Sequence, residues 1–170
     1  MKTTPEEGDT IALVKTNHGD IKILLYTEET PETTKNFTEL AKEGKYDGVL
    51  FHRIIKDFMI QAGDIEHKEG FGGHSYKGPG TNIPDEFVDE LTHVRGALSM
   101  ANTGAPNSGG SQFFVVHPED GTHFLDGKHT IFGFVYEGMD VVDKIADVET
   151  NPKDKPLEDV VIETIEISTQ

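Results

Sequence analysis

Short apolar stretches, separated by Gly, Pro, Asn and Asp, recur along the whole chain. The first two, Ile11–Thr16 and Ile21–Tyr26, flank the turn-like segment Asn17–Asp20 and predict a β-hairpin. Because the stretches are short and turn residues interrupt most of them, they favour an antiparallel sandwich or barrel over β-α-β units. The later stretches are rich in β-branched and aromatic residues and span Val49–Ile55, Phe58–Gln61, Ala97–Ala101, Gln112–Val116, Ile131–Val135 and Val160–Ile167.

Helical periodicity follows the segment Thr30–Glu32, a threonine, a proline and a glutamate in turn. Proline loses no hydrogen bond at the first helical position, and a carboxylate suits the positive end of a helix. Phe37, Leu40 and Ala41 supply an apolar stripe, and Gly44 is a stop signal. These residues predict one helix of about three turns.

A second helix is predicted over Met139–Ala146, where Val142 and Ile145 share one side and Asp140 lies near the start.

Between Gly63 and Asp85, by contrast, there is little periodicity, and such a long loop is typically functional or disordered. No repeat, linker or break in composition divides the 170 residues, so we predict a single domain over residues 1–170.

Composition excludes several classes of function. The net charge of −16 and pI near 4.7 oppose binding to nucleic acid or anionic lipid. No apolar run approaches the roughly 18 residues of a membrane span, and the first ten residues lack the apolar core of a signal peptide, so we expect a soluble, cytoplasmic protein. Without cysteine there is no disulfide, thiol nucleophile or thiolate metal site.

The stretch Phe51–Asp64 carries the first candidate chemistry. If both of its halves are strands, alternation places Arg53 with Ile55 on one face and Met59 with Gln61 on another. A surface arginine on an ordinary core strand is the alternative. Only two of the 15 basic residues are arginines, which suggests that a planar guanidinium is needed where they occur.

A second stretch, Leu98–Phe114, predicts a strand, a glycine-rich loop and another strand. Such an arrangement could leave backbone groups unpaired near Asn102, where an extended peptide would bind them. Read otherwise, the stretch is only a long hairpin. A third stretch spans Phe124–Gly133.

Together the three stretches resemble the signature of the cyclophilin family, and the resemblance extends from about Ile11 to Ile167. It implies a closed eight-stranded antiparallel barrel capped by two α-helices, with the active site on an outer face. It also implies peptidyl-prolyl cis/trans isomerase activity that assists folding of proline-containing polypeptides, without metal or cofactor. We expect a monomer.

The resemblance assigns site roles position by position. Arg53 matches the catalytic arginine, and Gln61 matches a second catalytic residue that also binds the neighbouring peptide. Phe124 stands where many members carry tryptophan, so the indole N–H donor is lost while most of the apolar wall remains. We therefore expect isomerase activity to survive and affinity for a cyclosporin-like inhibitor to be weakened. The proline pocket is matched by Phe58, Met59, Phe114 and Leu125, and the adjoining peptide site by Ala101, Asn102, Gln112 and His129, with Thr103 beside the subsite for the residue that precedes the X–Pro pair.

Other hypotheses compete with this one. A binding module would grip proline segments without catalysis, but it would lack the arginine or the pocket aromatics. A metal enzyme is suggested by His67 and His74, whose spacing fits no compact ligand pattern. A phosphate loop at Gly70–Gly73 lacks the lysine and serine or threonine that should follow. A serine hydrolase could use Ser99, Ser108 or Ser111, none of which lies in a G-x-S-x-G elbow.

Overall fold

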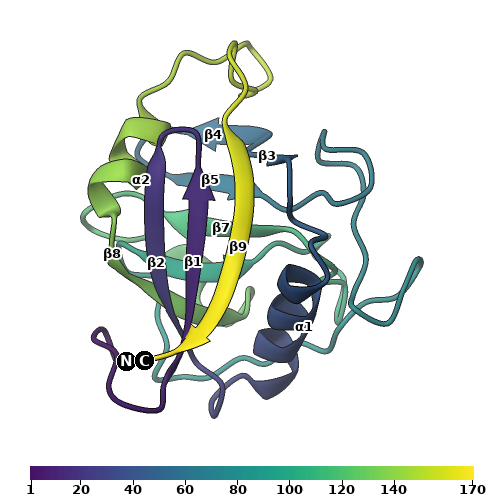
Figure 1. Ribbon diagram of the computed structural model, residues 1–170, viewed down its shortest axis with the longest axis vertical. Coiled ribbons are helices and arrows are strands. Elements are labelled where there is room, and N and C mark those ends of the chain that lie inside the picture. The colour runs from purple at the N-terminus through teal and green to yellow at the C-terminus, as the bar shows by residue number, and fades with distance from the viewer.

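The computed structural model describes all 170 residues and contains one nine-stranded antiparallel sheet and two α-helices (Figure 1). The helices are α1 (Pro31–Lys42) and α2 (Met139–Ala146), and a 3-10 turn spans His123–Leu125. The strands are β1 (Thr10–Thr16), β2 (Gly19–Leu25), β3 (Val49–Leu50), β4 (Arg53–Ile55), β5 (Met59–Ala62), β6 (Ala97–Met100), β7 (Phe113–Val116), β8 (Ile131–Glu137) and β9 (Val161–Thr169).

The sheet curls into two layers that cross one another. Its strand order is β3-β9-β1-β2-β8-β6-β7-β5-β4. Strands β2, β1 and β9 form one layer in Figure 1, and β7, β5 and β8 cross behind it, while α1 and α2 cover opposite ends. The predicted mainly-β antiparallel fold with two helices is confirmed.

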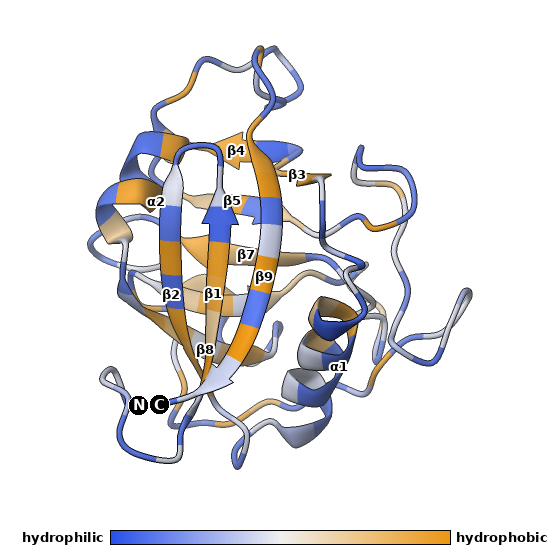
Figure 2. Ribbon diagram, in the orientation of Figure 1, coloured by the Kyte–Doolittle hydropathy of each residue, from blue (hydrophilic) through white to orange (hydrophobic).

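The predicted hairpin is confirmed as β1 and β2, with Val14 opposite Ile21. The Thr16 hydroxyl donates to the Gly19 carbonyl over 2.7 Å and so ties the two ends of the turn together. Apolar residues make up most of both strands (Figure 2), burial alternates from residue to residue along β1, and Val14 and Ile23 are almost completely buried. One face of the hairpin therefore covers the core.

The prediction of eight strands in a closed barrel was wrong in detail, because the stretch Val49–Ile55 forms two strands, β3 and β4, at the two ends of the sheet. Phe51 and Ile54 are 1% and 2% exposed and belong to the same core. Residues three apart on a continuous strand point to opposite faces, so the chain must bend between them. No ladder joins β3 to β4, and covalent continuity through residues 51–52 connects the two edges of the sheet.

Both helices have the predicted bounds to within a few residues, but the cap of α1 comes from elsewhere. The Thr30 hydroxyl donates to the Tyr26 carbonyl over 3.0 Å and does not cap the helix. Instead the Glu86 carboxylate accepts the backbone N–H groups of Glu32 and Thr33 at 3.1 and 2.8 Å. A distant anion therefore satisfies the free donors at the positive end of α1.

Apolar side chains form two clusters on opposite faces of the sheet. The inner cluster contains 27 buried residues, among them Phe37 of α1 and Phe113 of β7. The outer cluster contains eight buried residues, among them Met59 and Phe114. Because successive residues of β7 alternate between the two clusters, the strand that closes the core also provides an apolar floor on the outer face.

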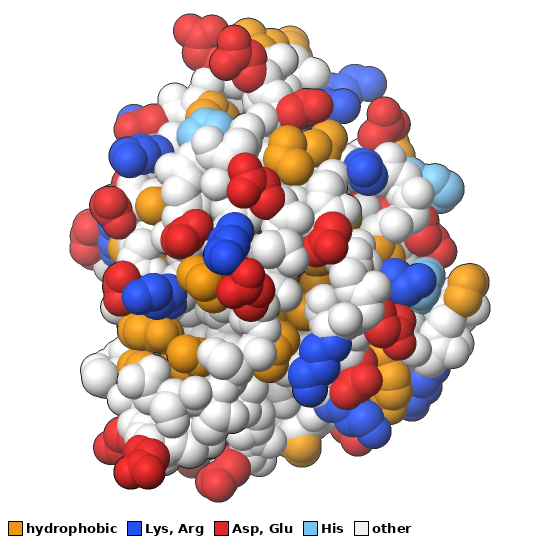
Figure 3. Space-filling view, in the orientation of Figure 1, with side chains coloured by type: hydrophobic (Ala, Val, Ile, Leu, Met, Phe, Trp, Pro, Cys, Tyr) orange, Lys and Arg blue, Asp and Glu red, His pale blue; other side chains and the backbone are white.

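Charged side chains of both signs are interspersed on the face formed by β2, β1 and β9 (Figure 3). Lys15 pairs with Glu166 at 2.7 Å and Lys22 with Glu137 at 2.9 Å, each across neighbouring strands. None of the helices is long and apolar enough to cross a membrane.

Candidate active site

A row of side chains crosses four strands on the outer face of the sheet. Arg53 of β4 lies directly opposite Gln61 of β5, and Gln61 lies opposite Phe114 of β7. Phe114 in turn lies opposite Ser99 of β6. Because directly opposed residues of an antiparallel sheet project to the same face, strand pairing alone brings a guanidinium, an amide and an aromatic ring together.

An open cavity of about 150 Å³ lies over this row. The Arg53 side chain is exposed, and its Nη1 donates to Gln61 Oε1 over 3.3 Å. Met59 and Phe114 are only 2% and 4% exposed and form the floor. The cavity is lined by nine of the predicted site residues: Arg53, Phe58, Met59, Gln61, Ala101, Asn102, Phe114, Leu125 and His129.

A second, more polar cavity of about 630 Å³ adjoins the first and shares Gln61, Ala101 and Asn102 with it. Thr103 and Gln112 line only this second cavity. We call the two together the groove, with an apolar half over Phe114 and a polar half over Gln112.

The backbone of Asn102 is open for pairing. Strand β6 pairs with the chain before β7 as far as Ala101, whose N–H donates to the Gln112 carbonyl over 3.0 Å. Beyond that point the backbone N–H and carbonyl of Asn102 have no hydrogen bond within the chain, while its side chain donates to the Lys128 carbonyl over 2.9 Å. A fixed residue with free main-chain groups can bind an extended peptide by strand-like pairing.

Phe124 lines neither cavity. Its ring is 64% exposed, and its centroid lies 5.8 Å from that of Phe58. The residue therefore extends the apolar half outward and does not form its floor.

Glutamine amides fix the polar side of the row. Gln61 Nε2 donates to Gln112 Oε1 over 2.9 Å, and Gln112 Nε2 donates to the carbonyls of Gly70 and Gly72 over 3.0 and 2.8 Å. The Gln61 oxygen that accepts from Arg53 thus belongs to a continuous chain of hydrogen bonds. A continuous series of hydrogen bonds of this kind holds each amide group in one orientation.

A buried imidazole supports the apolar half. His93 is 0% exposed and stacks on Phe114 with a centroid distance of 6.0 Å and an interplanar angle of 10°. Its Nδ1 lies 2.7 Å from Asp126 Oδ1, and its Nε2 lies 2.9 Å from the Ser99 hydroxyl. Burial lowers the pKa of His93, against the opposite effect of Asp126. Nδ1 of the neutral ring donates to Asp126, while the Ser99 hydroxyl beside Nε2 donates to the Thr130 carbonyl.

This Ser99-His93-Asp126 set has the connectivity of a hydrolase triad, but Ser99 is 0% exposed and has no access to a substrate. Its hydroxyl also lies 3.2 Å from the Thr130 carbonyl. Asp126 directly follows Leu125, so the pair of His93 and Asp126 fixes both an aromatic ring and an aliphatic side chain of the apolar half. The Ser99-His93-Asp126 set therefore supports the apolar half of the groove and does not act as a catalytic triad.

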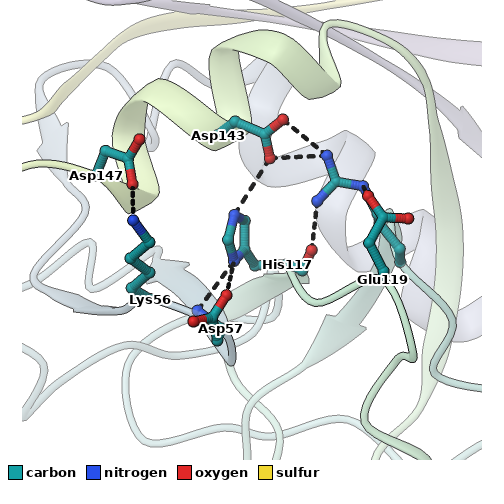
Figure 4. A network of polar contacts seen from close by, with 7 residues as sticks. Lys56, Asp57, His117, Glu119, Asp143 and Asp147 are labelled. Atoms are coloured by element: carbon teal, nitrogen blue, oxygen red, sulfur yellow. Dashed lines mark hydrogen bonds and ion pairs between the residues drawn. The ribbon is translucent and has the colours of Figure 1, made fainter.

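A polar network joins α2 to the turn that carries Phe58 (Figure 4). Arg95 Nη2 donates to both oxygens of Asp143 at 2.8 Å, and His117 Nε2 lies 3.2 Å from the same carboxylate. The Asp57 N–H donates to His117 Nδ1 over 3.0 Å, and the His117 N–H donates to the Phe58 carbonyl over 3.0 Å. Because Nδ1 accepts, the His117 proton lies on Nε2 and faces Asp143.

Four supporting residues, Asp64, His93, Asp126 and Asp143, have no role that is visible in the sequence. Only Arg95 carried a signal, namely the scarcity of arginine: its Nη2, Nη1 and Nε contact Asp143, the His117 carbonyl and Glu119, three directions that a single lysine nitrogen cannot serve. His67 and His74 belong to no group of three or more His, Asp or Glu side chains that could hold a metal ion. In the proposed phosphate loop, the N–H groups of Gly70 and Gly72 are occupied by Asp64.

Known proteins resemble this chain over most of its length. Residues 11–167 match the family model described as cyclophilin type peptidyl-prolyl cis-trans isomerase/CLD. A putative peptidyl-prolyl cis-trans isomerase of Staphylococcus aureus is 39% identical over 95% of this chain and 93% of its own length. A putative bifunctional phosphatase/peptidyl-prolyl cis-trans isomerase of Streptococcus pyogenes is 46% identical over 91% of this chain, which spans only 38% of that protein.

The fold agrees with solved structures. A cyclophilin type peptidyl-prolyl cis-trans isomerase of Cryptosporidium parvum superposes with a TM-score of 0.89 at 34% identity, over 95% of this chain and 99% of its own. A second crystal structure of that enzyme, in the presence of the dipeptide Ala-Pro, gives a TM-score of 0.88 at 34% identity, over 94% and 99% of the two chains. The family and enzyme class predicted from the three motifs are confirmed. The chain belongs to the cyclophilin-type peptidyl-prolyl cis-trans isomerases.

Proposed function

We propose that this chain isomerises X–Pro bonds of proline-containing polypeptides in the groove, with the Arg53 guanidinium stabilising the twisted transition state. The observation that carries the proposal is the shared cavity of about 150 Å³, in which a guanidinium faces an apolar floor of Met59 and Phe114. The Ala-Pro dipeptide present with the Cryptosporidium parvum relative supports an X–Pro ligand.

The chemistry requires no proton transfer to the product. Resonance gives the peptide bond a rotational barrier of about 18–20 kcal/mol, so uncatalysed exchange at X–Pro takes tens to hundreds of seconds. As the bond twists, the prolyl nitrogen becomes pyramidal and gains a lone pair that planar resonance had withheld. A donor aimed at this nitrogen binds the twisted form better than either planar form, which is the requirement for catalysis.

Arg53 suits this role because Gln61 Oε1 accepts from one end of the guanidinium and leaves other N–H groups free toward the cavity. Phe58, Met59, Phe114 and Leu125 would hold the prolyl ring. Gln61, Ala101, Asn102, Gln112 and His129 would hold the flanking peptide, with Thr103 beside the preceding residue, so that one side of the bond turns against a fixed partner. A reduction of the barrier by about 5–7 kcal/mol corresponds to roughly 10⁴–10⁵ in rate.

Cyclosporin-like inhibitors would bind this chain weakly. The exposed ring of Phe124 offers an apolar surface but no N–H donor. The monomeric state and the cytoplasmic location stay predictions.

A protease-coupled assay on an X–Pro tetrapeptide tests the proposal. Arg53→Lys keeps the charge but not the planar fork, so turnover should fall roughly a hundredfold. The reverse exchange Lys22→Arg on β2, which lines neither cavity, is the matched control and should leave turnover unchanged. An inactive parent protein, or an Arg53→Lys variant with parental turnover, would refute the proposal.

A further inference from the structure

A buried carboxylate organises the loop beside the polar half of the groove. Asp64 lies two residues after the end of β5 and is 0% exposed. Its Oδ1 accepts the backbone N–H groups of Glu66 and His67 at 3.0 and 2.9 Å, and its Oδ2 accepts those of Glu69, Gly70 and Gly72 at 3.2, 2.8 and 3.2 Å. We call residues 65–73 the Asp64 loop. Five main-chain donors converge on one side chain, as in a nest that binds an anion.

The backbone conformation of the Asp64 loop depends on Asp64 and on glycine residues more than on the other residues of the loop. Gly70 has φ = +99°, a conformation that L-residues rarely adopt. A Cβ atom at Gly70 would also lie 2.5 Å from Cδ2 of His52, which packs beneath the loop. The backbone at Gly70 is therefore fixed from two sides, by the hydrogen bond of its N–H to Asp64 and by the His52 ring, and its carbonyl is fixed with it.

The loop carbonyls in turn determine the orientation of Gln112. Gln112 Nε2 donates to the carbonyls of Gly70 and Gly72, which leaves its Oε1 to accept from Gln61. A reversed Gln112 amide would place its oxygen against two carbonyl oxygens. With Gln112 fixed, Gln61 presents its nitrogen to Gln112 and its oxygen to Arg53.

Only an ionised carboxylate satisfies all five donors. Burial raises the pKa of Asp64, but the N–H groups of His67, Gly70, Glu66 and Gly72 outweigh it and lower the pKa to about 2. Asparagine has the same shape, yet its NH₂ group would face either two or three N–H donors. The loop would have to move to relieve that conflict.

We propose that Asp64 is a positioning residue for Arg53, acting through the Gly70 and Gly72 carbonyls, Gln112 and Gln61. The inference rests on the proposed role of Arg53 in catalysis. Asp64 lines neither cavity, but residues of the Asp64 loop line the larger one, so a change at Asp64 that alters only peptide affinity would count against the relay.

Asp64→Asn tests the proposal in an NMR exchange assay that reports the exchange rate and the dissociation constant of a short X–Pro peptide. We expect kcat to fall roughly tenfold, as for one misdirected hydrogen bond to the reacting group, and the dissociation constant to stay within about twofold. The side-chain N–H resonances of Gln112, Gln61 and Arg53 should shift. Asp9→Asn, which removes a carboxylate contact to the Glu6 N–H near the termini, is the matched control.

The double variant separates positioning from general damage. In an Arg53→Lys background, Asp64→Asn should cost less than about twofold further, because the group it positions is already gone. A full tenfold loss in that background, a parental kcat in Asp64→Asn, or a loss confined to peptide affinity would overturn the proposal.

Gly70→Ala tests the same relay if Asp64→Asn does not fold. It displaces the Gly70 carbonyl without removing any charge and should likewise lower kcat and shift the Gln112 resonance. Parental kcat in a folded Gly70→Ala variant would contradict the relay. An active parent with unaffected variants removes only the role of Asp64, whereas an inactive parent removes the proposed function itself.

Discussion

The two halves of the groove are held in place by different kinds of contact. The polar half rests on Asp64, whose partners are backbone N–H groups of a single loop. The apolar half rests on pairs of side chains from distant elements, His93 with Asp126 and Asp143 with Arg95 and His117. The support of the polar half is local and does not depend on the side chains of the loop. The support of the apolar half depends on specific side-chain partners from distant elements.

The difference has consequences for sensitivity to mutation and to pH. A carboxylate that binds main chain tolerates any loop side chain that fits the backbone, as Glu66, His67 and Glu69 illustrate. Burial lowers the pKa of the His93 imidazole, so acidification works against its buried neutral form, whereas the Asp64 carboxyl has a pKa of about 2. The apolar half should therefore be the first to loosen on substitution or mild acidification.

The largest effect that separates the two kinds of support is expected for Asp143→Ala. The change leaves Arg95 and His117 without a shared acceptor and should lower the free energy of unfolding by about 1–2 kcal/mol, since the Arg95 side chain is only 22% exposed. Asp147→Ala, directly after the end of α2, removes an exposed pair with Lys56 and should cost less than about 0.5 kcal/mol. Urea unfolding of both variants measures the difference, and equal losses would contradict it.

Acidification should reveal two separate windows. Burial lowers the folded-state pKa of His93, so the unfolded chain binds the proton more readily and stability falls as pH drops below about 6.5, the unfolded value. The lowered pKa of Asp64 gives stability that is complete above about pH 4 and is lost as pH falls toward about 2.

Variants assign each window to its residue. His93→Gln should flatten the upper decline in part, because burial lowers the pKa of His52 as well, and should leave the lower window unchanged. Asp64→Asn should remove much of the stability loss in the lower pH window and leave the upper window unchanged. Urea midpoints measured from pH 7 to pH 2 check both, and a His93→Gln profile that parallels the parent throughout would disprove the assignment.

The smallest effect on catalysis is expected at the outer rim of the apolar half. Phe124→Trp restores an indole N–H and should raise affinity for cyclosporin roughly tenfold, about one hydrogen bond, with turnover within about twofold of the parent. Phe124→Leu, which lacks both ring and donor, is the control. Calorimetric titration measures the affinities, and equal cyclosporin binding by parent and Phe124→Trp would contradict the role given to the donor.

Much of the fold could be predicted because apolar periodicity reports burial directly. The hairpin of β1 and β2 and the helix α2 follow from it. The break between β3 and β4 could not be predicted, since only tertiary packing requires Phe51 and Ile54 to enter the same core. The motifs named all nine residues that line the apolar half of the groove, Arg53 and Phe114 among them, whereas they give no role to most residues that line the polar half.

The supports of the groove were not predictable for a different reason. Asp64 binds backbone N–H groups, which almost every residue type has, so the sequence does not show which residues are its partners. His93 and Asp126 are 33 positions apart, and Arg95 and Asp143 are 48 positions apart, so neither pair forms a local pattern. Such partners become visible only when the sheet brings their elements together.

The most direct test of the catalytic account measures binding and rotation on the same sample. Two-dimensional NMR exchange on an Ala-Pro peptide gives the dissociation constant and the on-enzyme interconversion rate for the parent and for Arg53→Lys. We predict affinity within about threefold and interconversion roughly a hundredfold slower in the variant, because the guanidinium acts on the twisted form and not on the planar ones. Interconversion at the parental rate, with the peptide still bound in the groove, would contradict the account.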